Sequence, residues 1–258
     1  MTESMMYRPE IDGLRALAVL PVVLYHAGVP WLPGGFMGVD VFFVISGYLI
    51  TSIIWRELKT GQFGIGRFYE RRFRRIVPAL LAVVVFVLVV APLIALPTQV
   101  VDTNKSALAA VLSVSNFWFW TQSGYFAPAV EFMPLLHTWS LAVEEQFYVI
   151  FPLLLLAARK IRIDVRRWTL LMLPVLFVAA VYLSYEKPAV AFYLLPARAW
   201  ELALGAALAL GVFPAIRSGA LASVMVFIGL LMLLAAYTFG HSGMVFPGFL
   251  AVLPCIGT

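Results

Sequence analysis

The chain has 258 residues, of which 63% are hydrophobic and 12% charged, with a mean hydropathy of +0.97 and a formal net charge of +5. A soluble domain is about half apolar, so this composition excludes an ordinary soluble protein and indicates a polytopic membrane protein. The basic excess does not indicate a nucleic-acid partner, because Lys and Arg gather at the ends of apolar runs, as the positive-inside rule predicts. The single cysteine, Cys255, excludes an intrachain disulfide and a cysteine-ligated metal site.

The first apolar run, residues 12–28, contains Asp12, Arg15 and His26. An α-helix turns about 100° and rises about 1.5 Å per residue, so Arg15 and His26 share one face and lie about 16 Å apart. Ionisable groups inside a membrane span are costly and usually mark a pathway or a site. A cleaved signal peptide does not fit this run, because no small-residue cleavage pattern follows and Arg15 interrupts the apolar stretch. We therefore expect a span that is retained in the mature protein. It carries a line of polar side chains, Asp12, Arg15 and His26, which we call the polar seam.

Eight apolar runs have about the 20 residues that a helix needs to cross a bilayer core. They cover residues 12–28, 36–55, 76–97, 140–158, 168–185, 192–212, 219–238 and a last run from about 244. The last run stops at Thr258, so we expect a sequence that is incomplete at its C-terminus. The predicted fold class is an all-α, polytopic transmembrane helix bundle of about eight spans, with one membrane domain over residues 1–258.

The loops between these runs predict the orientation of the chain. Residues 56–75 hold seven Lys or Arg and residues 159–167 hold five, so both loops are expected in the cytoplasm, together with Arg217. The amino terminus is then cytoplasmic. Arg15 should lie near the cytoplasmic end of the first helix and His26 near its outer end.

One aromatic-rich segment, residues 104–121, is apolar enough to count as a further span. A span here would move the basic loop at residues 159–167 to the outside, against the charge rule. We therefore expect an interfacial or re-entrant segment within a long extracytoplasmic connection, residues 98–139.

The segment GQFGIGRFYERRFRRIVP is predicted to form an amphipathic helix whose Pro78 begins the third span. Tyr69, Phe73 and Ile76 take one side of this helix. The other side displays a cluster of cations: Arg67, Arg71, Arg74 and Arg75. Guanidinium groups match the oxygens of a phosphorylated ligand. The alternative is a topology anchor that contacts anionic lipid.

Charged residues of later helices are expected at the depth of His26. Asp40 lies just inside the second span, and Glu144 and Glu145 lie in HTWSLAVEEQFY, both near the outer surface. Neighbouring residues point about 100° apart on a helix, so only one of the two glutamates can face a given target.

Two other polar groups have simpler explanations. Arg198 and Glu201 stand at a spacing that pairs on one helix face, which favours a structural ion pair. His137, Ser140 and Glu144 share one helical face, but a hydrolase triad needs its members to converge from different directions. No HExxH motif is present, and we expect no metal.

Five ordered motifs connect these segments to a known family. DGLRALAVLPVVLYH, GFMGVDVFFVISGYLIT, FYERRFRRIVPAL, HTWSLAVEEQFY and RAWELALG, in that order, resemble the acyltransferase-3 membrane family. The resemblance implies a bacterial inner-membrane enzyme that O-acylates a surface carbohydrate such as O-antigen, exopolysaccharide or peptidoglycan. Similar members often continue into an extracytoplasmic SGNH-hydrolase-like domain.

The resemblance assigns roles to residues of this chain. The family's arginine, ten residues, histidine pattern falls on Arg15 and His26, with the histidine as its catalytic residue. Its acidic pair falls on Glu144 and Glu145, without deciding which one acts.

The family's cytoplasmic arginine-x-x-arginine pattern falls on Arg72 and Arg75. Arg71 and Arg74 have the same spacing, so the register is open. The resemblance implies acetyl-CoA as the donor. A pantetheine arm is about as long as the separation of Arg15 and His26, so we expect the CoA phosphates on Arg15, Arg72 and Arg75 and the thioester near His26.

The expected chemistry centres on His26. A neutral imidazole is suited to act as general base on an acceptor hydroxyl, which attacks the thioester carbonyl. A carboxylate, from Glu145 or Asp40, would orient the ring and stabilise the imidazolium. An acyl-histidine intermediate is the alternative to direct transfer.

Two functions of other classes fit the composition. In a transporter or flippase, the same buried charges would form a proton relay and Arg15 would be a substrate gate. A non-catalytic scaffold of an envelope assembly is the third possibility. The ordered motifs favour the acyltransferase, whose partners would be acetyl-CoA, a surface or lipid-linked glycan and the lipid bilayer.

Overall fold

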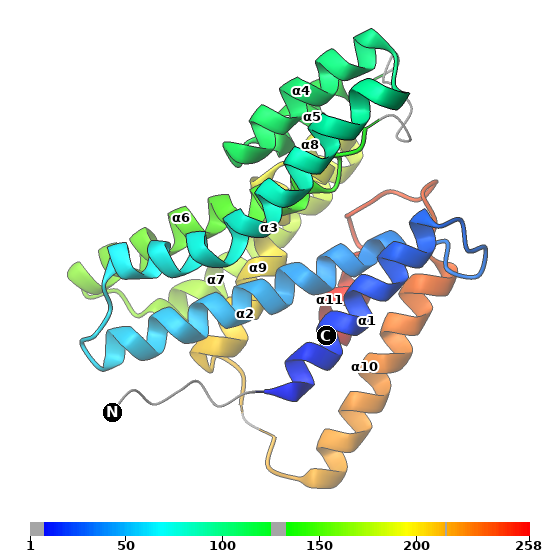
Figure 1. Cartoon of the computed structure of the whole chain (residues 1–258). Coiled ribbons are helices and arrows are strands. Elements are labelled where there is room, and N and C mark those ends of the chain that lie inside the picture. Colours follow the sequence, from blue (N-terminus) through cyan, green and yellow to red (C-terminus); the bar gives the residue numbers. More distant parts are fainter. Residues whose placement is uncertain (1–7, 125–132, 215) are drawn as a thin grey trace. The chain divides into compact units, whose positions relative to one another are not determined.

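The computed structural model describes residues 8–124, 133–214 and 216–258. Within these ranges the chain is helical and contains no β-strand (Figure 1). The elements in chain order are α1 (Pro9–His26), η1 (Gly35–Met37), α2 (Gly38–Lys59), α3 (Ile65–Ile94), α4 (Pro97–Val111), α5 (Ser115–Gln122), α6 (Thr138–Lys160), α7 (Val165–Glu186), α8 (Pro188–Tyr193), α9 (Leu195–Leu210), α10 (Gly219–Phe239) and α11 (Val252–Gly257). The predicted all-α class is confirmed.

Five of the described helices are long and apolar enough to cross a membrane, which corrects the expected count of eight. Their bounds are Gly35–Lys59, Ile65–Ile94, Thr138–Lys160, Val165–Glu186 and Gly219–Phe239. The other three predicted runs, 12–28, 192–212 and the run from about 244, do not form a spanning helix, each for a different physical reason.

Helix α1 has the necessary 18 residues but contains three charged side chains, Glu10, Asp12 and Arg15. The run expected at 192–212 is divided between α8 and the 16-residue α9, which is about 24 Å long and too short for a bilayer core of about 30 Å. The last run forms turns and then the six-residue α11.

Helix α3 is longer than expected at its N-terminal end. It begins at Ile65 and continues through Pro78, so the basic segment and the third span are one helix and Pro78 does not begin it. The burial pattern also differs from the expected one: Phe68 is buried, whereas Phe73 is 65% exposed. The segment 104–121 is not one helix, because α4 ends at Val111 and α5 begins at Ser115.

The described chain divides into two compact units. Unit 1 consists of Met1–Ser52, Arg166–Pro188 and Ala199–Thr258, and unit 2 consists of Ile53–Val165 and Ala189–Arg198. Helices α2 and α9 contribute residues to both.

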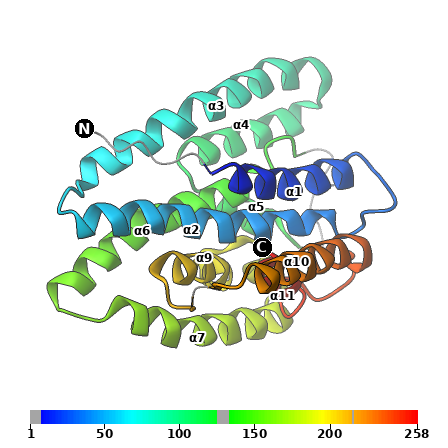
Figure 2. The ribbon, with the colours of Figure 1, turned by 90° about the horizontal axis from the view of Figure 1, so that it is seen from below.

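Glycines hold the central helices of unit 1 close together. A Cβ atom at Gly47 of α2 would collide with the main-chain oxygen of Leu202, and one at Gly205 of α9 would collide with that of Val44. Small residues at helix contacts allow this close approach in membrane proteins. Helix α9 also packs on α7, where the rings of Phe177 and Trp200 meet edge to face at 4.9 Å. Figure 2 shows α9 between α2 and α7.

A second set of close contacts holds α1 in unit 1. Cβ atoms at Gly35 and Gly38 would collide with the main-chain oxygens of Pro21 and Ala18 in α1. The hydroxyl of Tyr237 in α10 donates a hydrogen bond of 3.0 Å to the main-chain oxygen of Leu17. The helix that carries Arg15 and His26 is therefore held from two sides.

In unit 2, α3 and α6 lie side by side. The hydroxyl of Tyr69 donates to the main-chain oxygen of Val149 at 3.1 Å. Arg159, near the end of α6, donates to the main-chain oxygen of Leu58, near the end of α2, at 2.6 Å. The two basic loops that follow these helix ends therefore lie at the same end of unit 2, as the charge rule predicts for loops on one side of a membrane.

Candidate functional site

The first helix contains the predicted seam from Asp12 to His26. Arg15 Nη1 lies 2.9 Å from Asp12 Oδ1, with side chains 32% and 46% exposed. His26 lies in the last turn and is exposed, and its Nδ1 is 2.8 Å from the main-chain oxygen of Val22. A carbonyl oxygen only accepts, so this contact favours the tautomer with hydrogen on Nδ1 and the lone pair on Nε2. That tautomer is the one that a base acting through Nε2 requires.

Asp40 lies in the first turn of α2 and is completely buried within unit 1. A carboxylate at this position interacts favourably with the N-terminal end of the helix dipole. It also interacts electrostatically with Tyr237, a neighbour in the apolar cluster that includes Met37 and Val41. Asp40 and His26 therefore belong to the same unit and to successive helices.

Arg72 and Glu145 face one another inside unit 2. Arg72 of α3 interacts electrostatically with Glu145 and Tyr148 of α6, and its guanidinium carbon lies 5.9 Å from the ring centroid of Phe68. Among the described residues, Arg72 Nε and Glu145 Oε1 are both shielded from solvent and without a hydrogen-bond partner. A buried polar atom without a partner costs about 1–3 kcal/mol. A ligand group or a water that bonded to these atoms would be held favourably.

The structure distinguishes the two neighbouring glutamates of α6. Glu144 Oε2 accepts a hydrogen bond of 2.6 Å from the hydroxyl of Tyr148, one turn later on the same helix. Glu145 instead interacts with Arg72 across to α3. Glu144 therefore has a partner on its own helix and Glu145 interacts with another helix, and which of the two acts in a site stays a prediction.

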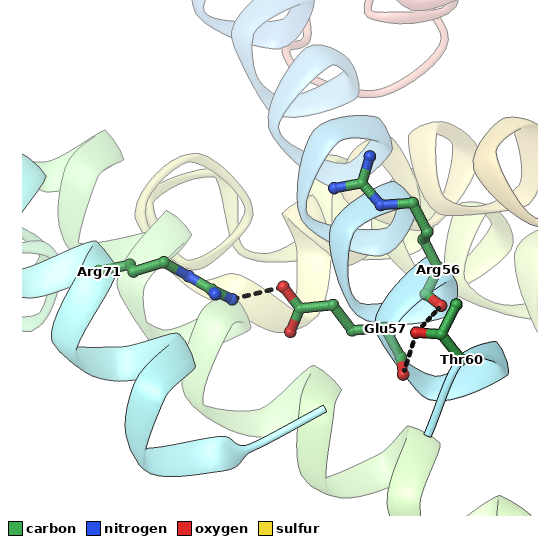
Figure 3. Close-up of polar contacts among 4 residues, drawn as sticks. All are labelled: Arg56, Glu57, Thr60 and Arg71. Atoms are coloured by element: carbon green, nitrogen blue, oxygen red, sulfur yellow. Dashed lines mark hydrogen bonds and ion pairs between the residues drawn. The ribbon is translucent and has the colours of Figure 1, made fainter. Parts of the chain in front are cut away.

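The structure also distinguishes the two possible registers of the arginine pattern. Arg71 Nη2 lies 2.7 Å from Glu57 Oε1 (Figure 3), and Arg74 Nη2 lies 2.8 Å from Glu70 Oε1. Within the described chain, Arg72 and Arg75 form no ion pair with an acid. Acids thus pair with both arginines of the alternative register, whereas Arg72 interacts with Glu145 only electrostatically, so the assignment of Arg72 and Arg75 to a ligand stays a prediction.

The remaining predicted polar residues have structural contacts. Ser140 Oγ donates to the main-chain oxygen of His137 at 3.2 Å. Arg198 is completely buried, donates to the main-chain oxygen of Phe192 and lies 5.5 Å from the ring centroid of Trp139. These contacts in unit 2 stabilise helix packing.

Sequence reasoning did not find Glu57 or Tyr148. Glu57 stands fourteen positions before Arg71, beyond any spacing within one helix, so only the turn between α2 and α3 brings the two together. Tyr148 had a usable signal, because its spacing of four from Glu144 pairs side chains on a helix.

The predicted site residues are divided between the two units. Unit 1 holds Arg15, His26 and Asp40, and unit 2 holds Arg72, Arg75 and Glu145. The expected action of Glu145 on His26 stays a prediction. Across residues 8–124, 133–214 and 216–258, no group of three His, Cys, Asp or Glu side chains could hold a metal ion.

Comparison with known proteins identifies the family. The family model described as "Acyltransferase domain" matches residues 8–257. The O-acetyltransferase OatA of Staphylococcus aureus strain NCTC 8325 / PS 47 is 45% identical over 150 residues, which are 58% of this chain and 25% of the relative. OatA of S. aureus strain COL matches with the same values, so the aligned segment spans about a quarter of these relatives. No solved structure matches. Because the family model covers nearly the whole chain, the chain belongs to the acyltransferase-3 family.

Proposed function

We propose that this protein is a membrane-bound O-acyltransferase that moves an acetyl group from cytosolic acetyl-CoA to a hydroxyl of an extracytoplasmic carbohydrate. The observation that carries the proposal is the family match over residues 8–257, which includes every residue of the candidate site. The S. aureus relatives named O-acetyltransferase OatA support acetyl as the acyl group. The five apolar helices support a location in the bacterial inner membrane.

The donor would enter from the cytoplasm, the side on which the positive-inside rule predicts the basic loops and the amino terminus. Arg72 and Arg75 would hold the phosphates of CoA, since a guanidinium group pairs with phosphate oxygens in a bidentate manner. The buried Arg72 Nε without a partner among the described residues supports this assignment. Arg15 keeps its predicted contact with the donor, although Asp12 already pairs with its Nη1.

His26 would act as the general base. Its Nε2 takes the proton of the acceptor hydroxyl as the oxygen attacks the thioester carbonyl. The new C–O ester bond forms, the C–S bond breaks, and the imidazolium returns its proton to the departing thiolate. Asp40, which belongs to the same unit as His26, would supply the negative charge that stabilises the imidazolium. Glu145 would keep the charge of Arg72 in place.

The test is a transfer assay with the full-length protein in detergent or liposomes, with acetyl-labelled acetyl-CoA and a cell-wall or surface-glycan acceptor. Wild type should consume the thioester and label the acceptor. His26→Ala should reduce the transfer rate about 100-fold or more, the range of general-base catalysis. His241→Ala is the matched control, because His241 is exposed and its Nδ1 accepts a hydrogen bond of 3.2 Å from the main-chain N–H of Gly243 in the same loop.

Three outcomes decide between the alternatives. Full activity of His26→Ala would contradict the role of His26 as general base. Acetyl label that remains on the wild-type protein but not on His26→Ala would replace direct transfer by an acyl-histidine intermediate. If the wild type uses no thioester with any acceptor, the result would favour the hypothesis of a transporter or flippase.

A further inference from the structure

Glu57 connects the end of α2 to the start of α3 through its side chain. Its Oε1 accepts a hydrogen bond of 2.7 Å from Arg71 Nη2, an ion pair between two helices (Figure 3). The Glu57 side chain is only 16% exposed, whereas Arg71 is 42% exposed. Glu57 Oε2 is buried and has no hydrogen-bond partner among the described residues. The carboxylate is therefore a largely buried charge that depends on Arg71.

The main chain of Glu57 holds the same turn. Its carbonyl oxygen accepts hydrogen bonds from Gln62 N at 2.9 Å, Phe63 N at 3.2 Å and Thr60 Oγ1 at 3.2 Å, the last drawn in Figure 3. Gly61 in this turn has a φ of +70°, which a residue without a Cβ adopts without strain. Glu57 thus contacts both the turn, through its main chain, and the first part of α3, through its side chain.

The Glu57–Arg71 pair contributes to fixing the rotation of α3 about its own axis, together with the buried Phe68 and the Tyr69 contact to Val149. Successive residues of a helix point about 100° apart, so a helix held at Arg71 directs Arg72 to another side. On that side Arg72 packs over Phe68 and interacts with Glu145. The pair of Glu70 and Arg74 cannot do the same, because both residues belong to α3 and both side chains are more than half exposed.

We propose that Glu57 is a positioning residue for the donor site, which withdraws Arg71 from the ligand and turns Arg72 and Arg75 toward the phosphates of acyl-CoA. The inference rests on the proposed function. It goes beyond the arginine pattern, because it assigns a role to an acid on another helix and explains why Arg71 is unavailable to the ligand.

The experiment measures the Kd for CoA and the KM and kcat for acetyl-CoA with full-length protein. Glu57→Ala should raise Kd and KM about five- to tenfold, the range expected from losing a partly buried ion pair, and leave kcat within about twofold. Glu70→Ala, which removes the ion pair within α3, should change neither. The charge-exchanged variant Glu57→Arg with Arg71→Glu should recover most of the lost affinity, as coupling of two contacting residues requires.

The direction of the change in Kd in Glu57→Ala distinguishes two roles of Arg71, as the partner of Glu57 or as a phosphate ligand. If Arg71 itself bound the phosphate, Glu57→Ala would release it and lower Kd, and that result would overturn the proposal. Equal effects of Glu57→Ala and Glu70→Ala, or no recovery in the exchanged variant, would overturn it as well. If Glu57→Ala does not remain monodisperse, Glu57→Gln keeps the shape of the side chain and removes its charge, and the same increase in Kd is expected. Failure of the wild type to bind CoA or use acetyl-CoA would instead reject the proposed function.

Discussion

The hydroxyl of Tyr237 donates a hydrogen bond of 3.0 Å to the main-chain oxygen of Leu17, across from α10 to α1. Leu17 O needs this donor because Pro21, four residues later in the helix, has no N–H to give it. In a membrane, such a carbonyl must find another donor within the protein. The proline that interrupts the hydrogen bonds of α1 thus creates the acceptor that ties α1 to α10, between Arg15 and His26.

Tyr237→Phe should lower stability, because it removes the donor and leaves a shielded acceptor unsatisfied. The expected loss is about 1–3 kcal/mol. Thermal unfolding of the detergent-solubilised protein, followed by a thiol-independent fluorescence signal, measures it as a lower Tm. Tyr182→Phe is the control, because Tyr182 of α7 is 64% exposed. Equal Tm values for the two variants would show that the hydrogen bond contributes nothing.

The close contact of α2 with α9 in unit 1 gives a second prediction. Gly47→Leu should lower the yield of folded protein and its Tm, because even a Cβ at this position meets the main-chain oxygen of Leu202. Overpacking of this kind costs about 1–3 kcal/mol or more. Gly13→Ala in α1 should be neutral or slightly stabilising, because a Cβ there meets nothing within 4 Å. A stable Gly47→Leu variant would mean that the two helices separate readily.

Hydropathy and motif spacing were sufficient for the helical class and for the seam of α1, where Arg15 and His26 lie in one helix as predicted. They overestimated the number of spans, because an apolar run does not reveal where its helix begins and ends. The run at 192–212 shows this, because its helix is divided between α8 and the 16-residue α9, whose Ala206, Ala207 and Leu210 are almost completely buried in unit 1. The unavailability of Arg71 could not be predicted either, since Glu57 is distant in sequence and meets it only after α2 and α3 have folded back on each other.

The contact of Arg159 with Leu58 predicts a common side for two loops. In a Cys255→Ala background, Gln62→Cys and Ile161→Cys should both react with an impermeant maleimide only after the cytoplasmic face is opened, since both residues are exposed beside that contact. Trp31→Cys should react in intact cells, because Trp31 is 79% exposed and precedes the opposite end of α2. Labelling of residues 62 and 161 from different sides would contradict the helix pairing. Labelling of both from outside would reverse the orientation and leave the pairing intact.

The choice of register in the basic segment gives the last prediction. The double variant Arg72→Ala with Arg75→Ala should raise the KM for acetyl-CoA about 100-fold or more, because each of the two lost charged contacts to phosphate costs about 1.5–3 kcal/mol and about 1.4 kcal/mol is a factor of ten. Arg72→Lys should recover only part of this loss, since an ammonium group lacks the planar fork that pairs with two phosphate oxygens. Arg74→Ala is the matched control on the same helix, because its side chain is 78% exposed and already pairs with Glu70.

Membrane insertion must be measured for each of these variants, because arginines of a cytoplasmic segment also determine topology. The maleimide labelling of residues 62 and 161 in the same background provides that measurement. A raised KM with unchanged labelling would identify Arg72 and Arg75 as ligand residues. Altered labelling with an unchanged KM for the correctly inserted fraction would make the segment a topology anchor, and the phosphates would then need another partner.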